Sequence, residues 1–221
     1  MIFEHAKVDL GYNDLDAVTS ETGRVYKTPE GAKYPSITTV LSILSEDSIQ
    51  KWKARVGEEE ANRISTRASL RGTAVHEIIE KYLDNQEDYK NGYTPDIINS
   101  FISVRGILDR QIGRIFGQEC PLYSHHLRVA GRVDCVAEFD GKRSIIDFKT
   151  SRKPKKREHI TNYFMQEAAY AIMWEERTNQ PITQLVTIIA VDHEEPQVFI
   201  EHRDNWTEQL LDTIKKHRER T

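Results

Sequence analysis

The dipeptide Asp140-Gly141 lies between two β-rich runs, and it constrains the fold of this 221-residue chain more than any other feature. An Asp-Gly pair in this context is a strong signal for a β-hairpin with a two-residue loop. With that loop, Phe139 lies opposite Lys142, and counting outward along both strands places Asp134 directly opposite Asp147.

This register also sorts the side chains by face, because alternate residues of a strand point to opposite sides. Lys149 is expected to join Asp134 and Asp147 on one face. The other face receives two apolar pairs, Val133 with Phe148 and Cys135 with Ile146. Facing carboxylates repel, so the pair is expected to share a proton or to bind a cation. The alternative is an ordinary solvated face on which two acids and a lysine align by chance.

Two helical patterns supply further polar candidates. His76 lies in the apolar stripe of a helix predicted over 72–84, as either a core histidine or a metal ligand that would suit Mn²⁺ better than Mg²⁺. Gln166 and Tyr170 are four residues apart in a helix predicted over about 159–178. They are expected either to hydrogen-bond a phosphate oxygen or to form a half-buried helix edge.

Charge and composition exclude several classes of protein. The net charge of -4 argues against binding to nucleic acid by overall charge, but residues 142–157 hold eight Lys or Arg and one acid. Arg152 and Lys153 belong to this basic segment and could guide a nucleic-acid strand, whereas the cluster at 215–220 is expected to be a solvated face. Arg157 ends the basic segment and shares its expected role.

Cysteine content and hydropathy argue against some metal sites and against a membrane span. The only cysteines, Cys120 and Cys135, cannot form a four-cysteine iron–sulfur or zinc site. No apolar run approaches the ~20 residues that span a bilayer, and no targeting pattern is visible at the N-terminus. We therefore expect a cytoplasmic protein.

The order of elements predicts one α/β domain over residues 1–221. It has a helical front over about 36–116, a sheet core over about 117–203 and a terminal helix over 205–219. A small hairpin is expected over 24–34, with Ser36 capping the first helix. Further expected elements are a helix over 95–116 and strands over 118–124, 127–139, 143–150, 183–192 and 197–203.

Four short motifs occur in one order. They are GTAVH at 72–76, GRVD at 131–134, IDFKTS at 146–151 and Gln166-x-x-x-Tyr170. Together they resemble the RecB-type branch of the PD-(D/E)XK nuclease superfamily. Two further segments, YPSITTVLS at 34–42 and KWKAR at 51–55, resemble the mitochondrial genome maintenance exonucleases and their bacteriophage relatives.

The resemblance implies a restriction-endonuclease-like core, in which helices flank a mixed central sheet. It implies that Mg²⁺ or Mn²⁺ is bound by His76, Asp134, Asp147 and the carbonyl of Phe148. Asp134, Asp147 and Lys149 would be the catalytic residues. Lys149 would orient or deprotonate the attacking water, or stabilise the charge of the transition state.

Other residues take supporting roles in this resemblance. Gln166 and Tyr170 would hold Lys149 and the DNA backbone, while Glu80 and Glu119 have no assigned role beyond salt bridges or support. Trp52, Tyr163 and Phe164 are candidates for base stacking, or else for core packing.

The implied function is a metal-dependent DNA exonuclease that prefers single-stranded ends. It would act in a bacterial or phage-infected cytosol, without an iron–sulfur cluster and without a membrane. Two alternatives remain open: a single-strand or structure-specific endonuclease of the same fold, and a non-catalytic nucleic-acid-binding relative.

Overall fold

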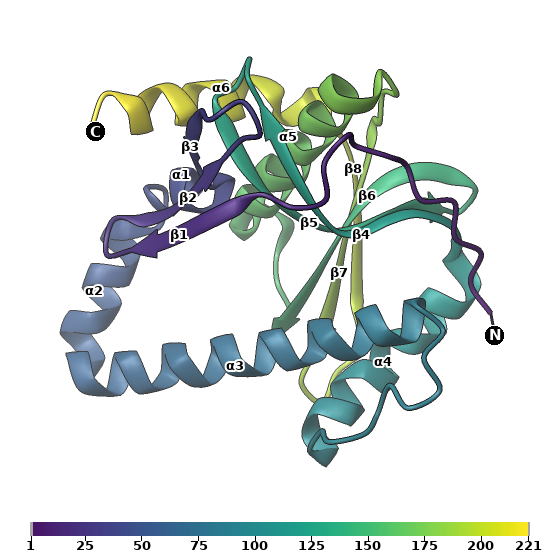
Figure 1. The fold of residues 1–221 in the computed structure, drawn as a ribbon. Helices are drawn as coiled ribbons and strands as arrows, with labels where there is room; N and C mark the ends of the chain where they lie inside the picture. The colour runs from purple at the N-terminus through teal and green to yellow at the C-terminus, as the bar shows by residue number, and fades with distance from the viewer. Residues whose placement is uncertain (1, 221) are drawn as a thin grey trace.

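A five-stranded mixed sheet with helices on both faces forms the centre of the computed structural model, which describes residues 2–220 (Figure 1). Its strands, in spatial order, are β4 (Ile112–Ser124), β5 (Val129–Phe139), β6 (Lys142–Ser151), β7 (Gln184–Val191) and β8 (Gln197–His202). Only β6 and β7 run parallel. This architecture confirms the expected α/β fold with a restriction-endonuclease-like core.

The β5–β6 hairpin has the register expected from its Asp-Gly loop. Phe139 pairs with Lys142, and Cys135 pairs with Ile146. Asp140 and Gly141 have φ angles of 50° and 75°, as a two-residue turn that follows the strand twist requires. Parallel pairing of β6 with β7 needs a long crossover, which α5 (Thr161–Thr178) provides.

Each face of the sheet buries its own apolar cluster. On one face, α5, α6 (Asp204–Arg218) and the short α1 (Ile37–Ser42) cover a core that contains Phe164 and Trp174. On the other, α3 (Glu58–Leu83) and α4 (Pro95–Gln111) cover a core that contains Phe101 and Ile146. All four of these core residues are fully buried.

Two predicted boundaries in the helical half are wrong. The helix expected over 95–116 ends at Gln111, and β4 begins at Ile112. Ile112 and Ile115 are apolar positions that fit a helical stripe and a strand equally well, so periodicity could not locate the change. The helix expected over 72–84 begins instead at Glu58. The first half of this helix buries almost nothing, so its sequence has no apolar stripe from which the true start could be predicted.

The N-terminal part forms a separate three-stranded sheet of β1 (Asp16–Ser20), β2 (Gly23–Lys27) and β3 (Lys33–Pro35). Pairing of β2 with β3 confirms the hairpin predicted over 24–34. Ser36 caps α1 as expected, since its hydroxyl accepts a 3.0 Å hydrogen bond from the Thr39 amide. β1 was not expected, because all its residues are exposed and show no alternation.

The helices before the sheet lie partly away from the rest of the molecule. α2 (Glu46–Val56) buries no residue, and no residue of α3 is buried between Ala61 and Val75. Figure 1 shows this first half of α3 running across from the lower end of α2 towards the sheet. Within residues 2–220, none of the helices has the length and apolarity that a membrane span requires.

Candidate functional site

β6 carries an aspartate and a lysine on one side of the central sheet. Asp147 is 1% exposed, and its carboxylate forms an ion pair with the ammonium of Lys149, two residues further along the strand. Burial raises the pKa of Asp147 to about 6, although the charge of Lys149 opposes this shift. Burial lowers the pKa of Lys149, but the charges of Asp147 and Asp134 outweigh it and the net pKa lies above its ordinary value. Lys149 is therefore a cation at neutral pH.

Asp134 reaches the same region from β5, just beyond the end of the regular ladder. The pairing of β5 with β6 ends at Cys135 and Ile146, one pair before the two aspartates. In place of a further backbone bond, the amide of Phe148 donates a 2.9 Å hydrogen bond to Asp134 Oδ2. A side chain thus takes over the connection between the strands.

One expectation about this hairpin is wrong. Val133 packs with the cluster beneath α5, whereas Cys135 packs with the cluster beneath α3 and α4, so they do not share a face. The physical reason is the end of the ladder at Cys135, beyond which Asp134 bonds to the Phe148 amide and strict alternation is lost.

A cluster of possible metal ligands forms where α3 meets β4 and β5. One ligand atom each from His76, Glu119 and Asp134 lies within 4.8 Å of the others. His76 Nδ1 is 3.5 Å from Asp134 Oδ2. Burial raises the pKa of Glu119 to about 7, and the nearby charges of Asp134 and Glu80 act in the same direction.

Two carboxylates and an imidazole fit a divalent cation. The pKa of Glu119 is raised although the charge of Arg132 opposes the shift, so Arg132 compensates the negative charge of Glu119 only in part. A divalent cation would supply further compensation, and oxygen donors suit Mg²⁺ and Mn²⁺ while the imidazole favours Mn²⁺. Asp147, whose pKa the charge of Asp134 also raises, is the nearest further carboxylate on β6.

Glu119 is a site residue to which the sequence reasoning gave no such role. It lies between the β4–β5 pairs Gln118–Cys135 and Cys120–Val133, which places it beside Asp134. Its φ of 47° marks a local irregularity of β4. The turn that sets this register spans four residues, 125–128, without a recognisable two-residue signal, so the pairing could not be counted as it was for β5 and β6.

α5 supplies further polar groups next to Asp147, from the other side of this aspartate than the His76, Glu119 and Asp134 cluster. Gln166 Nε2 donates a 3.2 Å hydrogen bond to Asp147 Oδ1 and lies 3.5 Å from the hydroxyl of Tyr170. Gln166 was expected to hold Lys149, but the residue it contacts is Asp147. Gly131 of β5 leaves room for the Tyr170 ring, because a Cβ at position 131 would lie 2.7 Å from that ring.

Glu167, next to Gln166, is a buried acid that the sequence analysis overlooked. Its side chain is fully buried and accepts a hydrogen bond from the hydroxyl of Thr187 on β7. Thr187 pairs with Asp147 in the β6–β7 register. Burial raises the pKa of Glu167 well above its ordinary value, and the charge of Asp147 adds to this. A glutamate within the apolar run around Met165 and Ala168 was the available signal.

Some residues predicted to contact nucleic acid are exposed, whereas others are ion-paired or buried. Arg152 and Lys153 are exposed in the segment that follows β6. Arg157 was expected to join them, but it forms an ion pair with Glu201, so its charge is already compensated. Phe164, a stacking candidate, is fully buried in the core.

The other two stacking candidates are half-buried. Trp52 lies on α2, and the ring of Tyr163 lies 5.1 Å from Lys149 Nζ. Tyr163 is therefore the aromatic side chain among the three that borders the candidate site.

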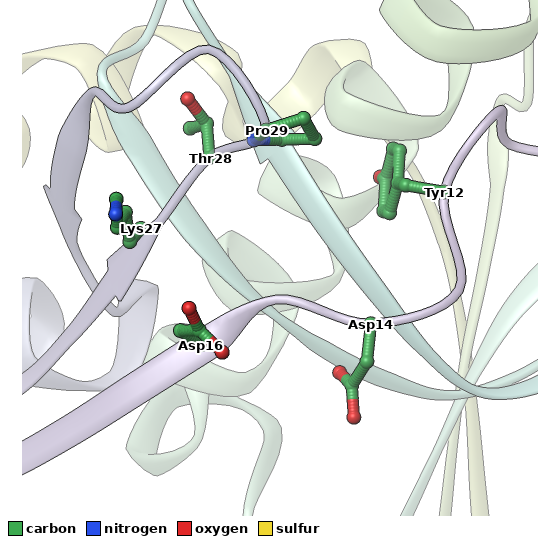
Figure 2. A pocket seen from close by; sticks show the side chains of 6 residues that line it. All are labelled: Tyr12, Asp14, Asp16, Lys27, Thr28 and Pro29. Atoms are coloured by element: carbon green, nitrogen blue, oxygen red, sulfur yellow. The ribbon is translucent and has the colours of Figure 1, made fainter.

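A separate open hollow lies by the N-terminal sheet. Figure 2 shows its lining, which consists of Tyr12, Asp14, Asp16, Lys27, Thr28 and Pro29. None of the predicted site residues lines it. Arg132 is the link to the site, because it bonds both the Asp14 carboxylate and, at 2.5 Å, the carbonyl oxygen of Glu119.

Comparisons with known proteins agree with the geometry. Residues 99–221, more than half of the chain, match the family described as the PD-(D/E)XK nuclease superfamily. Mitochondrial genome maintenance exonuclease 1 of Mus musculus and of Homo sapiens is 32% identical over 129 and 130 residues. Each match covers 55% of this chain and 38% of the relative, so the matched region spans well under half the length of these relatives.

A solved structure from Eubacterium rectale also matches part of this chain. The similarity covers 68% of this chain and 65% of that one, with a TM-score of 0.44 and 14% identity.

Proposed function

The chain belongs to the PD-(D/E)XK nuclease superfamily, and from this premise we propose that it is a metal-dependent DNA exonuclease acting on single-stranded ends. The observation that carries the proposal is the convergence of Asp134, Asp147 and Lys149 at one side of the central sheet, beside His76 and Glu119. An ion-pairing lysine and several carboxylates, gathered at a buried position, suit the hydrolysis of a phosphodiester.

The metal-binding role is assigned to His76, Glu119, Asp134 and Asp147. When bound, a divalent ion would supply Lewis-acid polarisation of the phosphoryl oxygen and a more acidic water. The carbonyl of Phe148 remains a proposed ligand, supported by the resemblance alone. Mg²⁺ and Mn²⁺ are the proposed ions, because most of these donors are carboxylate oxygens.

Lys149 is assigned to charge stabilisation. Its pKa lies above the ordinary value, so at neutral pH the side chain carries a proton and does not act as a base. A fixed ammonium in a poorly solvated position interacts strongly with charge that develops on a phosphate. Gln166 would keep the Asp147 carboxylate oriented, since it donates to Oδ1 while Lys149 pairs with the carboxylate.

The preference for a single strand rests on surfaces next to the site. α3 carries His76 near its buried end, and its preceding stretch from Asn62 to Leu70 is exposed apart from the half-buried Ile64. The cation Arg67 lies on this stretch, whereas Arg63 is paired with Glu60. Arg152 and Lys153 are exposed directly after β6. Exposed cations near an aromatic side chain are the combination that holds a single strand by its phosphates and bases. The names of the curated relatives add support for an exonuclease.

The decisive experiment compares substrates that differ in ends and strandedness. End-labelled linear single strands, blunt duplexes and covalently closed single-stranded circles are incubated with Mg²⁺, Mn²⁺ or EDTA. We expect metal-dependent degradation of the linear single strand, slower degradation of the duplex and no cleavage of the circle.

Each other outcome selects a different function. Cleavage of the circle would make the protein an endonuclease. Binding of DNA without cleavage in either metal would make it a non-catalytic relative. Cleavage that continues in EDTA would contradict the assigned metal role.

A further inference from the structure

α3 stands free of the remaining protein over most of its first half. From Asn62 to Leu70 no side chain is buried, and Leu70 is 67% exposed. Nine residues of helix span about 14 Å. Within this stretch Ile64 is half-buried and the other side chains are exposed. A helix with so little packing along such a length takes its direction mainly from the contacts at its two ends.

The contacts at the sheet end begin at Arg71. Its guanidinium forms a two-pronged ion pair with Asp192, with Nη1 2.8 Å from Oδ2 and Nη2 bonded to Oδ1. Nη2 also donates a 3.1 Å hydrogen bond to Ser100 on α4. The Arg71 side chain is only 18% exposed, so the pair is less screened than a surface pair.

Asp192 connects this pair to the strand that carries the catalytic candidates. It directly follows β7, and its amide donates a 3.0 Å hydrogen bond to the carbonyl of Ser151, the last residue of β6. Gly72 lies close to Thr150 of β6, since a Cβ at Gly72 would be 3.8 Å from the threonine hydroxyl. α3 thus joins the sheet next to the end of the strand that holds Asp147 and Lys149.

We propose that the Arg71–Asp192 ion pair is a positioning joint that sets the direction of the exposed half of α3 relative to the metal-binding side chains. The inference rests on the proposed function, and it concerns how a strand held along α3 is aimed at the site. Arg71 is five residues before His76 on the same helix. A rotation of about 10° at Arg71 would move Asn62 by roughly 2–3 Å, which is large compared with the precision that an aligned substrate needs.

The test separates strand placement from chemistry. Arg71→Met, Asp192→Asn and the double variant are assayed on single-stranded DNA of about 30 nucleotides, which is long enough to extend along α3. We expect each single variant to raise KM roughly 5- to 10-fold and to change kcat less than about twofold. Because the two side chains act as one pair, the double variant should resemble either single variant.

Three comparisons keep this result interpretable. Glu4→Gln removes a carboxylate from an exposed ion pair with Arg114 and should leave KM unchanged. Its neighbour His5 bonds the carbonyl of Leu83 at the C-terminal end of α3, twelve residues beyond Arg71, so the change does not touch the Arg71–Asp192 pair. Arg71→Lys keeps the charge but loses the two-pronged geometry, so an intermediate KM is expected. Circular dichroism melting identifies any variant that does not fold. If Arg71→Met does not fold, Asp192→Asn is used in its place to test the pair.

The proposal is overturned if Asp192→Asn leaves KM unchanged while Arg71→Met raises it, because Arg71 would then bind DNA directly. A fall in kcat at constant KM also overturns it, because the pair would then act on the metal site. If the wild-type protein cleaves no DNA, the proposed function fails separately. In that case the dissociation constant of the same oligonucleotide is measured by fluorescence anisotropy in EDTA. Across the variants this constant should rise or stay unchanged in the way that is expected for KM.

Discussion

The amide of Phe148 donates a hydrogen bond to the Asp134 carboxylate at the point where β5 and β6 stop pairing through their backbones. This contact fixes an acid of one strand to the backbone of the next, between Asp147 and Lys149 in the sequence. The carboxylates that the hairpin brings together are therefore held by the hairpin itself, and α3 and α5 add His76 and Gln166 from either side.

Replacement of Asp147 or Lys149 should lower the cleavage rate by orders of magnitude without unfolding the protein. Asp147→Asn removes the charge of a proposed metal ligand, and Lys149→Met removes the ammonium that is proposed to stabilise charge on the phosphate. Loss of one such electrostatic contribution typically lowers kcat by about 10²- to 10³-fold. Single-turnover cleavage of a labelled single strand measures the loss, and far-UV circular dichroism checks the fold. Cleavage at the wild-type rate in either variant would contradict the assignment.

Gln166 and Tyr170 should differ in importance, although the sequence motif treats them alike. Gln166 donates directly to Asp147, whereas the Tyr170 hydroxyl is 3.5 Å from Gln166 and contacts the carboxylate only through it. We expect Gln166→Leu to lower kcat about 10-fold or more and Tyr170→Phe to lower it less than about threefold. Equal losses in the two variants would show that the hydroxyl has a role of its own.

The metal-free protein should become less stable as the pH rises through neutrality. The folded pKa of Glu119 is about 7 against an ordinary value of 4.5, so the folded state holds its proton more tightly. Between these values the folded state binds more protons than the unfolded state, and the free energy of unfolding falls as pH rises. Above the folded pKa the loss is complete.

Glu119→Gln removes this contribution and provides the matched variant. In EDTA, the wild-type Tm should fall by a few degrees more than that of Glu119→Gln between pH 5 and pH 8. Part of the fall should remain in the variant, because the pKa of Asp147 is also raised, to about 6. Parallel curves for the two proteins would mean that Glu119 is not the group responsible.

Sequence reasoning reached the site where a local rule fixed the geometry, and it failed where the geometry depended on distant contacts. The Asp140-Gly141 turn determines the β5–β6 register, so the neighbourhood of Asp134 and Asp147 follows from counting. Glu119 depends on a four-residue turn, for which no such rule applied. The first half of α3 lacks an apolar stripe because it buries nothing, so its helical state had no periodic signal.

The exposed cations after β6 should contribute to the salt dependence of DNA binding. Each phosphate contact to a single strand contributes a slope of roughly -0.7 to log K against log salt. Arg152→Ala combined with Lys153→Ala should therefore weaken binding and reduce the slope by about 1.4. Lys215→Ala combined with Lys216→Ala removes the same charge from an exposed end of α6 and should leave the slope unchanged. Equal effects of the two pairs would indicate a response to net charge alone.

His76 should matter more for activity with Mn²⁺ than with Mg²⁺. An imidazole nitrogen suits Mn²⁺ better, whereas the carboxylates of Glu119 and Asp134 serve both ions. His76→Asn should raise the Mn²⁺ concentration for half-maximal cleavage about 10-fold or more, and the Mg²⁺ concentration by a smaller factor. His126→Asn, which changes an exposed histidine in the turn after β4, is the matched control and should alter neither. An equal increase for both ions would mean that His76 holds Asp134 in place, 3.5 Å away, and does not itself bind the metal.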